Sequence, residues 1–126
     1  MISESVSTTM RITLLLLICS LTIVNVDAFD FMRMGHYLGY VGCYVDKSQR
    51  LLARFAGEGN MSLGKCRHLC RGYRYLGLQY GKQCLCGNYL NHRAYPQSSE
   101  LQCNMVCTSE PHRMCGGPWR NSIYRV

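Results

Sequence analysis

Eight of the nine cysteines in this chain lie between positions 43 and 115, and their number and spacing limit what the chain can fold into. An even number of cysteines in so short a segment predicts a closed set of disulfides. Disulfides persist only in oxidising compartments. The eight residues are Cys43, Cys66, Cys70, Cys84, Cys86, Cys103, Cys107 and Cys115. We therefore expect a small extracellular fold that is held together by disulfides.

The ninth cysteine, Cys19, lies in a segment with the organisation of a secretory signal peptide. Arg11 precedes the apolar run 12–24, and residues 26–28 (Val-Asp-Ala) supply the small side chains that signal peptidase requires. The run is shorter than the about 20 apolar residues that a transmembrane helix needs. We predict cleavage after residue 28, which removes Cys19; an uncleaved signal anchor is the alternative.

Removal of the signal peptide 1–28 leaves a lead-in at 29–39 and one domain at 40–126. Met10 is an alternative start to Met1. A domain of this size has a small core, and disulfides supply the missing stability. We expect a secreted monomer that has no stable membrane span and needs no cofactor.

The chain carries a formal net charge of +7 at pH 7 and contains nine tyrosines. Outside the cell, a basic protein meets acidic glycans, glycoproteins and membrane surfaces, so we expect one of these partners and no nucleic acid. A soluble basic surface without a specific partner explains the charge equally well. Tyrosine rings fill small cores, and they also stack on sugar rings.

Residue patterns place most of the cysteines on short elements. Alternating apolar residues predict strands, and the spacing of Leu63, Cys66, Leu69 and Cys70 predicts a helix capped by Ser62. Tyr44 and Tyr80 are expected in the core. The expected elements are strands at 40–45, 51–56, 76–80, 83–86 and 122–126, a helix at 63–70, a polar loop at 87–98, and a short helix that Ser98 or Ser99 caps and that runs through Leu101, Cys103 and Cys107.

This placement favours one disulfide pairing. Cys66 and Cys70 share a helix face because they are four residues apart, and Cys84 and Cys86 share a strand face. A helix laid over this strand brings the two faces together. The four favoured bridges are Cys66–Cys84, Cys70–Cys86, Cys107–Cys115 and Cys43–Cys103. Eight cysteines allow about 105 pairings, so other pairings stay open.

Metal binding and catalysis find little support in the residue patterns. The chain lacks the paired C-x2-C units and the His spacing of common structural zinc sites, so we expect no metal. His68 would point away from its neighbouring cysteines on a helix. No Ser/His/Asp set, phosphate loop or pair of carboxylates is recognisable, and the cysteines are committed to disulfides. We expect that the protein is not an enzyme.

The segments around the cysteines resemble the WSC domain, which occurs in yeast cell-wall stress sensors, Kremen receptors and polycystins. The resemblance extends from Tyr40 to about Val126. The segments that carry it are Tyr40–Asp46, Met61-Ser62, Cys66-x3-Cys70, Tyr75–Gly87, Cys103-x3-Cys107, Cys115–Gly117 and Ile123-Tyr124.

The resemblance implies a small α+β, disulfide-rich module that is similar to PAN/apple domains. Such a module has a short antiparallel sheet and one or two short helices. The usual pairing of the family matches the four bridges above, and the family implies carbohydrate binding. One departure is that Gln83 and Leu85 stand where many members carry an acid and an aromatic residue, which would suit contact with sugar.

A sugar site needs aromatic faces beside amide and guanidinium groups. The 87–98 loop and the segment after Gly117 offer both, although packing against the C-terminal strand is the competing role for the tryptophan. The candidate contacts are Asn88, Tyr89, His92, Arg93, Tyr95 and Trp119. Asn60 begins a sequon for N-glycosylation.

These features predict a secreted protein that binds an extracellular glycan or glycoprotein. Two alternatives remain: a module for extracellular protein–protein interaction or a matrix scaffold, and a disulfide-rich defence effector. The second alternative, the defence effector, lacks support from a cationic amphipathic helix.

Overall fold

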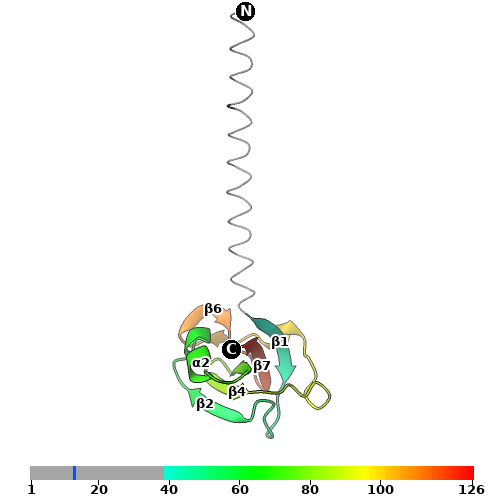
Figure 1. Cartoon of the computed structure of the whole chain (residues 1–126). Coiled ribbons are helices and arrows are strands. Elements are labelled where there is room, and N and C mark those ends of the chain that lie inside the picture. Colours follow the sequence, from blue (N-terminus) through cyan, green and yellow to red (C-terminus); the bar gives the residue numbers. More distant parts are fainter. Residues whose placement is uncertain (1–12, 14–38) are drawn as a thin grey trace, which may run out of the picture. The chain divides into compact units, whose positions relative to one another are not determined.

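The computed structural model describes Thr13 and residues 39–126, and residues 39–126 lie in one compact unit (Figure 1). The predicted signal peptide at 1–28 and lead-in at 29–39 therefore fall outside the described residues, apart from Thr13 and Gly39.

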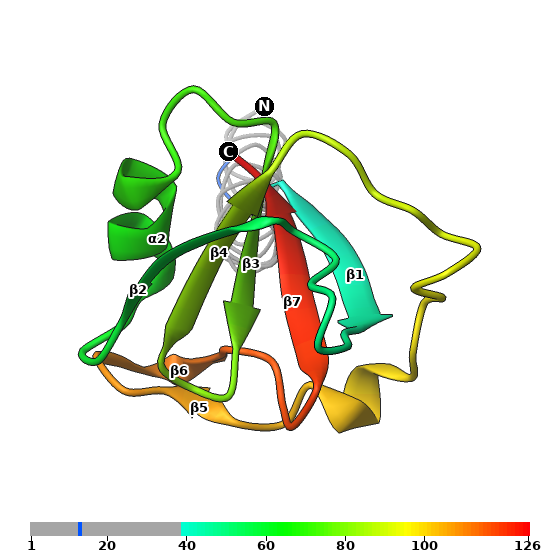
Figure 2. The ribbon, with the colours of Figure 1, turned by 90° about the horizontal axis from the view of Figure 1, so that it is seen from below.

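The domain is built on a five-stranded antiparallel sheet with the strand order β1-β7-β3-β4-β2 (Figure 2). A second, two-stranded antiparallel sheet pairs β5 with β6. The elements are β1 (Tyr40–Val45), β2 (Arg54–Glu58), α2 (Leu63–Leu69), β3 (Tyr75–Gln79), β4 (Gln83–Gly87), the 3-10 helix η1 (Glu100–Gln102), β5 (Val106–Cys107), β6 (Glu110–Met114) and β7 (Arg120–Arg125). The expected small α+β module with a short antiparallel sheet is confirmed.

The helix α2 begins where the sequence predicts. The Ser62 hydroxyl oxygen accepts a hydrogen bond from the Lys65 amide at 3.1 Å, which satisfies one of the free N–H groups of the first turn. The helix buries Leu63 and Cys66 against the sheet and ends at Cys70. The predicted cap is confirmed, and so are Leu63, Cys66 and Cys70 of the predicted apolar face, whereas Leu69 is exposed.

Both faces of the large sheet are covered, which explains why β3 and β4 bury four consecutive residues each. One face packs under α2, where Met61, Leu76, Leu78 and Tyr124 form a core with the cysteines. The opposite face forms a second core. Its buried members are Tyr44, Leu51, Leu52, Leu85 and Ile123. Leu85 is fully buried, so the aromatic that many relatives carry at this position would lie in a core in this structure.

Four disulfides link these elements, and they join the pairs that the sequence favours. Two of them, Cys66–Cys84 and Cys70–Cys86, join α2 to β4. These two bridges are adjacent, because the sulfurs of Cys70 and Cys84 lie 3.7 Å apart. The bridges are Cys43–Cys103, Cys66–Cys84, Cys70–Cys86 and Cys107–Cys115. The longest closes 60 residues and the shortest closes 8. In the loop-entropy picture these bridges stabilise the fold by about 4 and 2.5 kcal/mol, respectively.

The helix predicted from Ser98 or Ser99 through Cys107 is wrong beyond its first turn. Ser99 caps only the short η1, and Leu101 is 84% exposed, so a longer helix would have no apolar face to bury. Instead, the chain after η1 forms hydrogen bonds with a distant segment. The Met105 amide donates to the Gly116 carbonyl at 2.9 Å, and β5 then follows.

The strand predicted at 51–56 is displaced toward the C-terminus. Leu51 and Leu52 form a bend, because the Leu51 amide donates to the buried Asp46 carboxylate at 2.8 Å and both leucines enter the second core. The strand β2 therefore begins only at Arg54.

Candidate functional site

Two aromatic residues, Tyr80 and Trp119, hold backbone conformations that side chains other than glycine rarely adopt. Their φ angles are 55° and 52°, and they are the only non-glycine residues with positive φ in the described part of the chain. An L-residue in this region costs about 1–2 kcal/mol. Residues held in this way cluster at binding and catalytic sites, so these two positions mark a candidate site.

Each of the two residues occupies a turn position that favours glycine or asparagine. Tyr80 and Gly81 (φ 75°) are the central residues of the β3–β4 turn, and positive φ at both is the type I′ pattern. Trp119 follows Pro118 in a turn that Gly117 and Arg120 close with two hydrogen bonds, of 3.0 and 3.1 Å. Positive φ at the residue after a turn proline is the type II pattern.

These two turns meet at a depression of about 210 Å³, which we call the turn pocket. Its lining consists of Arg50, Gln79, Tyr80, Gln83, Pro118 and Trp119. Tyr80 is 47% exposed and Trp119 is 50% exposed. The expectation that Tyr80 belongs to the core is therefore wrong, because β3 ends at Gln79 and the turn directs the next residue outward.

The indole of Trp119 is held by a clamp centred on the buried Asp46. The Asp46 amide donates to the Trp119 carbonyl at 2.9 Å. The Asp46 carboxylate accepts from the Arg50 guanidinium at 2.9 Å, and the Arg50 guanidinium carbon lies 5.1 Å from the centre of the Trp119 ring. This cation–π contact fixes the orientation of the ring. The Asp46 carboxylate, in turn, neutralises Arg50 locally.

Buried amides lie behind the aromatic pair. Gln79 is 3% exposed, and its Oε1 has no hydrogen-bond partner among the described residues. Asn121, the cross-strand neighbour of Gln79, is fully buried, and both its side-chain oxygen and nitrogen lack partners in the same region. Leaving a buried polar atom unpaired costs about 1–3 kcal/mol. Gln79 lines the turn pocket, but its Oε1 is buried beneath the pocket surface.

A disulfide braces both turns. The Gly81 amide donates to the Cys115 carbonyl at 2.9 Å, and the Gly81 carbonyl accepts from the Thr108 amide at 3.0 Å. Cys115 is bonded to Cys107 and begins the segment that leads to Trp119. The small β5–β6 sheet therefore sets the position of the Tyr80 turn and of the Trp119 turn together.

An ion pair flanks the Tyr80 turn. The Lys82 ammonium lies 2.9 Å from the Glu58 carboxylate. Their hydrogen bond lowers the pKa of Glu58 and raises the pKa of Lys82. Both side chains are exposed, so the pair contributes little to stability.

A second depression, about 570 Å³ and more open, lies at the edge of the sheet and is called the edge pocket. Phe55 on the edge strand β2 is 50% exposed and Tyr89 is 83% exposed. The lining residues are Ala53, Arg54, Phe55, Tyr73, Cys86, Gly87, Asn88 and Tyr89. The edge pocket lies where β4 ends, whereas the turn pocket lies where β4 begins.

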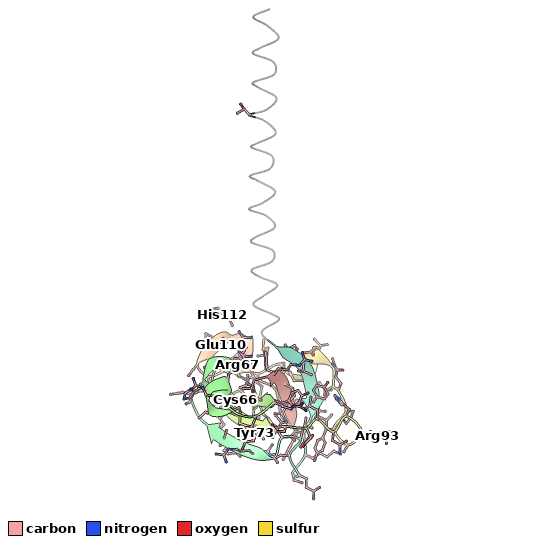
Figure 3. All side chains as sticks on the ribbon, viewed as in Figure 1. Cys66, Arg67, Tyr73, Arg93, Glu110 and His112 are labelled. Carbon is pink, nitrogen blue, oxygen red and sulfur yellow. A yellow bond between two sulfur atoms is a disulfide. The ribbon has the colours of Figure 1, made fainter. Side chains whose placement is uncertain are left out.

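The six residues expected to contact sugar do not form one site. Asn88 and Tyr89 line the edge pocket, and Trp119 lines the turn pocket. The remaining three lie on the connecting loop. Figure 3 shows Arg93 on the side of the domain away from Arg67 of α2.

Tyr95 is half-buried beside the second core, whereas His92 is exposed and its ring borders Tyr44. The His92 ring lies 5.5 Å from the buried Tyr44 ring, and the Tyr95 hydroxyl donates to the Gln49 carbonyl. Tyr95 also packs against the second core. Their contacts are structural.

The sulfurs of Cys66, Cys70 and Cys84 lie within 4.8 Å of one another. Each is already bonded to another sulfur, so none is a thiolate that can bind a metal ion.

A model of the WSC domain family matches residues 40–117. The chain belongs to the WSC domain family. The match includes Tyr80 and the cysteines, and Trp119 lies just beyond its end. None of the helices among the described residues has the length and apolar content to cross a membrane.

This chain matches its relatives over the domain alone, and the match covers only part of each relative's length. The chain is 34% identical over 86 residues to a WSC domain-containing protein of Arthroderma benhamiae, covering 67% of this chain and 12% of that protein. It is 37% identical over 94 residues to xylosyltransferase oxt of Drosophila melanogaster, covering 68% and 10%. It is 30% identical over 95 residues to Kremen protein 2 of Mus musculus, covering 72% and 21%. The chain thus spans about a tenth to a fifth of these relatives.

Proposed function

We propose that this WSC domain is a carbohydrate-binding module and that its site is the turn pocket. The observation that carries the proposal is the pairing of two half-exposed aromatic residues, both in positive-φ turns, at one depression. The positive φ at both positions costs free energy that glycine or asparagine would avoid. A functional requirement for the two aromatic rings explains why tyrosine and tryptophan stand there.

The chemistry of the turn pocket suits a neutral sugar. Tyr80 and Trp119 present apolar faces on which the C–H face of a sugar ring can stack. Because Asp46 neutralises Arg50, the pocket gives no net attraction for an anion. Its volume of about 210 Å³ is below the range of about 300–1,000 Å³ of drug-sized pockets and suits one sugar ring at a time.

We further propose that the protein is secreted after removal of residues 1–28, acts as a monomer and carries no catalytic activity of its own. Asn60 is exposed at the turn before α2, which makes its sequon accessible for glycosylation in the secretory pathway.

The direct test is calorimetric titration of the secreted protein with neutral polysaccharides: laminarin, xylan and chito-oligosaccharides. We expect at least one to bind, and Trp119→Ala to weaken that binding about 30-fold, as loss of a central aromatic anchor does. Tyr89→Ala is the matched control, because it removes an exposed aromatic from the edge pocket. Absence of binding to every member of the panel, or equal losses in the two variants, contradicts the proposal.

A further inference from the structure

The edge pocket differs from the turn pocket in its charge. Arg54 lines it, and the Arg74 amide donates to the Oδ1 of Asn88 in its wall at 2.9 Å. Arg71 lies on the same short connection between α2 and β3 as the pocket residue Tyr73. The side chains of Arg54, Arg71 and Arg74 are all exposed.

No acidic side chain balances these arginines in the described residues. The ion pairs of the described chain join Asp46 to Arg50, Glu58 to Lys82, and Glu110 to Arg113. The fourth described acid, Glu100, accepts from the Tyr40 hydroxyl and the Cys43 amide. Arg54, Arg71 and Arg74 therefore keep their charges available for a ligand.

The pocket combines the charge of Arg54 with aromatic rings, and Arg71 and Arg74 lie on the α2–β3 connection that carries Tyr73. Phe55, Tyr73 and Tyr89 line it, and Tyr89 is more exposed than any other aromatic residue in the described chain. Guanidinium groups bind sulfate and carboxylate through two parallel hydrogen bonds. Aromatic rings and an amide recognise the sugar ring that carries such groups.

We propose that the edge pocket is a second binding site, which takes an anionic polysaccharide that carries sulfate or carboxylate groups. The two sites lie at opposite ends of β3 and β4, so a neutral and an anionic glycan can bind at the same time. In this way the domain cross-links two kinds of polysaccharide.

The experiment titrates the secreted full chain with heparin, which is sulfated, and with hyaluronan, which carries carboxylates alone. We expect Arg54→Ala/Arg74→Ala to lower heparin affinity at least about tenfold and Tyr89→Ala to lower it at least about threefold. Arg54→Lys/Arg74→Lys keeps the charge and loses the forked donors, so it should also weaken binding. Affinity should fall with added salt.

The matched control is Lys47→Ala/Arg93→Ala, which removes two positive charges that do not line the edge pocket. Equal weakening in this control, or an unchanged affinity in Tyr89→Ala, overturns the proposal in favour of diffuse attraction. Tighter binding of single-stranded oligo-dT than of heparin overturns it in favour of nucleic acid. Laminarin or xylan binding should be unaffected by the edge-pocket variants, so failure here is distinct from failure of the proposed function.

Discussion

Tyr80 and Trp119 line one depression from two separate turns, and both hold their backbones at positive φ, 55° and 52°. Type I′ and type II turns usually place glycine or asparagine at these positions. The fold thus accepts a local cost in order to present two rings at one depression.

The first prediction concerns that cost. Replacing Tyr80 with asparagine, which tolerates positive φ, removes the ring and relieves the backbone. We expect the free energy of unfolding of Tyr80→Asn to stay within about 1 kcal/mol of the wild type, because the gain of about 1–2 kcal/mol in the backbone offsets lost packing. Binding of the neutral glycan should fall at least tenfold. A stability loss above about 2 kcal/mol with unchanged binding would make Tyr80 a structural residue.

The second prediction concerns the brace between the two turns. Cys107→Ala/Cys115→Ala opens a loop of 8 residues and should lower the free energy of unfolding by about 2.5 kcal/mol. It should also weaken neutral-glycan binding below the melting temperature, because Gly81 and Trp119 lose their common support. The control, Cys43→Ala/Cys103→Ala, should cost more stability, about 4 kcal/mol, without weakening binding by the folded protein. The reverse pattern of affinities would contradict this role.

The cysteine framework was predictable from the sequence because helix and strand periods place Cys66, Cys70, Cys84 and Cys86 on facing surfaces. The turn pocket was not. Tyr80 continues the alternation of Leu76 and Leu78, which favours a core position, and only the following Gly81 signals that the strand has ended.

Gln79 and Arg50 carry no motif, and the sequence separates them from Trp119. Their meeting depends on the pairing of β3 with β7 and on the bend at Leu51. By contrast, Pro118 before Trp119 was a usable signal for a turn that presents the ring.

The third prediction tests the backbone that leads to Trp119. A Cβ at Gly116 (φ 70°) would lie 2.3 Å from the carbonyl oxygens of both Arg120 and Leu78. Since backbone atoms cannot withdraw easily, Gly116→Ala should lower the free energy of unfolding by about 3 kcal/mol or prevent folding. Gly64→Ala on α2 is the control: it meets no atom within 4 Å and should raise stability by about 0.5–1 kcal/mol. Thermal unfolding of both variants checks this, and similar effects in the two would contradict it.

The fourth prediction concerns alkaline pH. Burial, and then the 2.5 Å hydrogen bond to Glu100, raise the pKa of Tyr40 above its ordinary value. The folded state therefore holds this proton more tightly than the unfolded chain does. The associated stability is present below the unfolded pKa of about 10 and is lost as the pH rises above it. Denaturant unfolding from pH 8 to 11 should show this decline, and Tyr40→Phe should reduce its slope. An unchanged slope would contradict the assignment.

The most direct measurement uses Trp119 as its own reporter, because the chain contains one tryptophan. The neutral polysaccharide that binds in calorimetry is titrated into the protein while the fluorescence of Trp119 is recorded. The proposed site predicts a saturable change in emission that follows the calorimetric isotherm and is lost in Tyr80→Asn. Binding in calorimetry with no change in Trp119 emission would show that the sugar binds elsewhere on the domain.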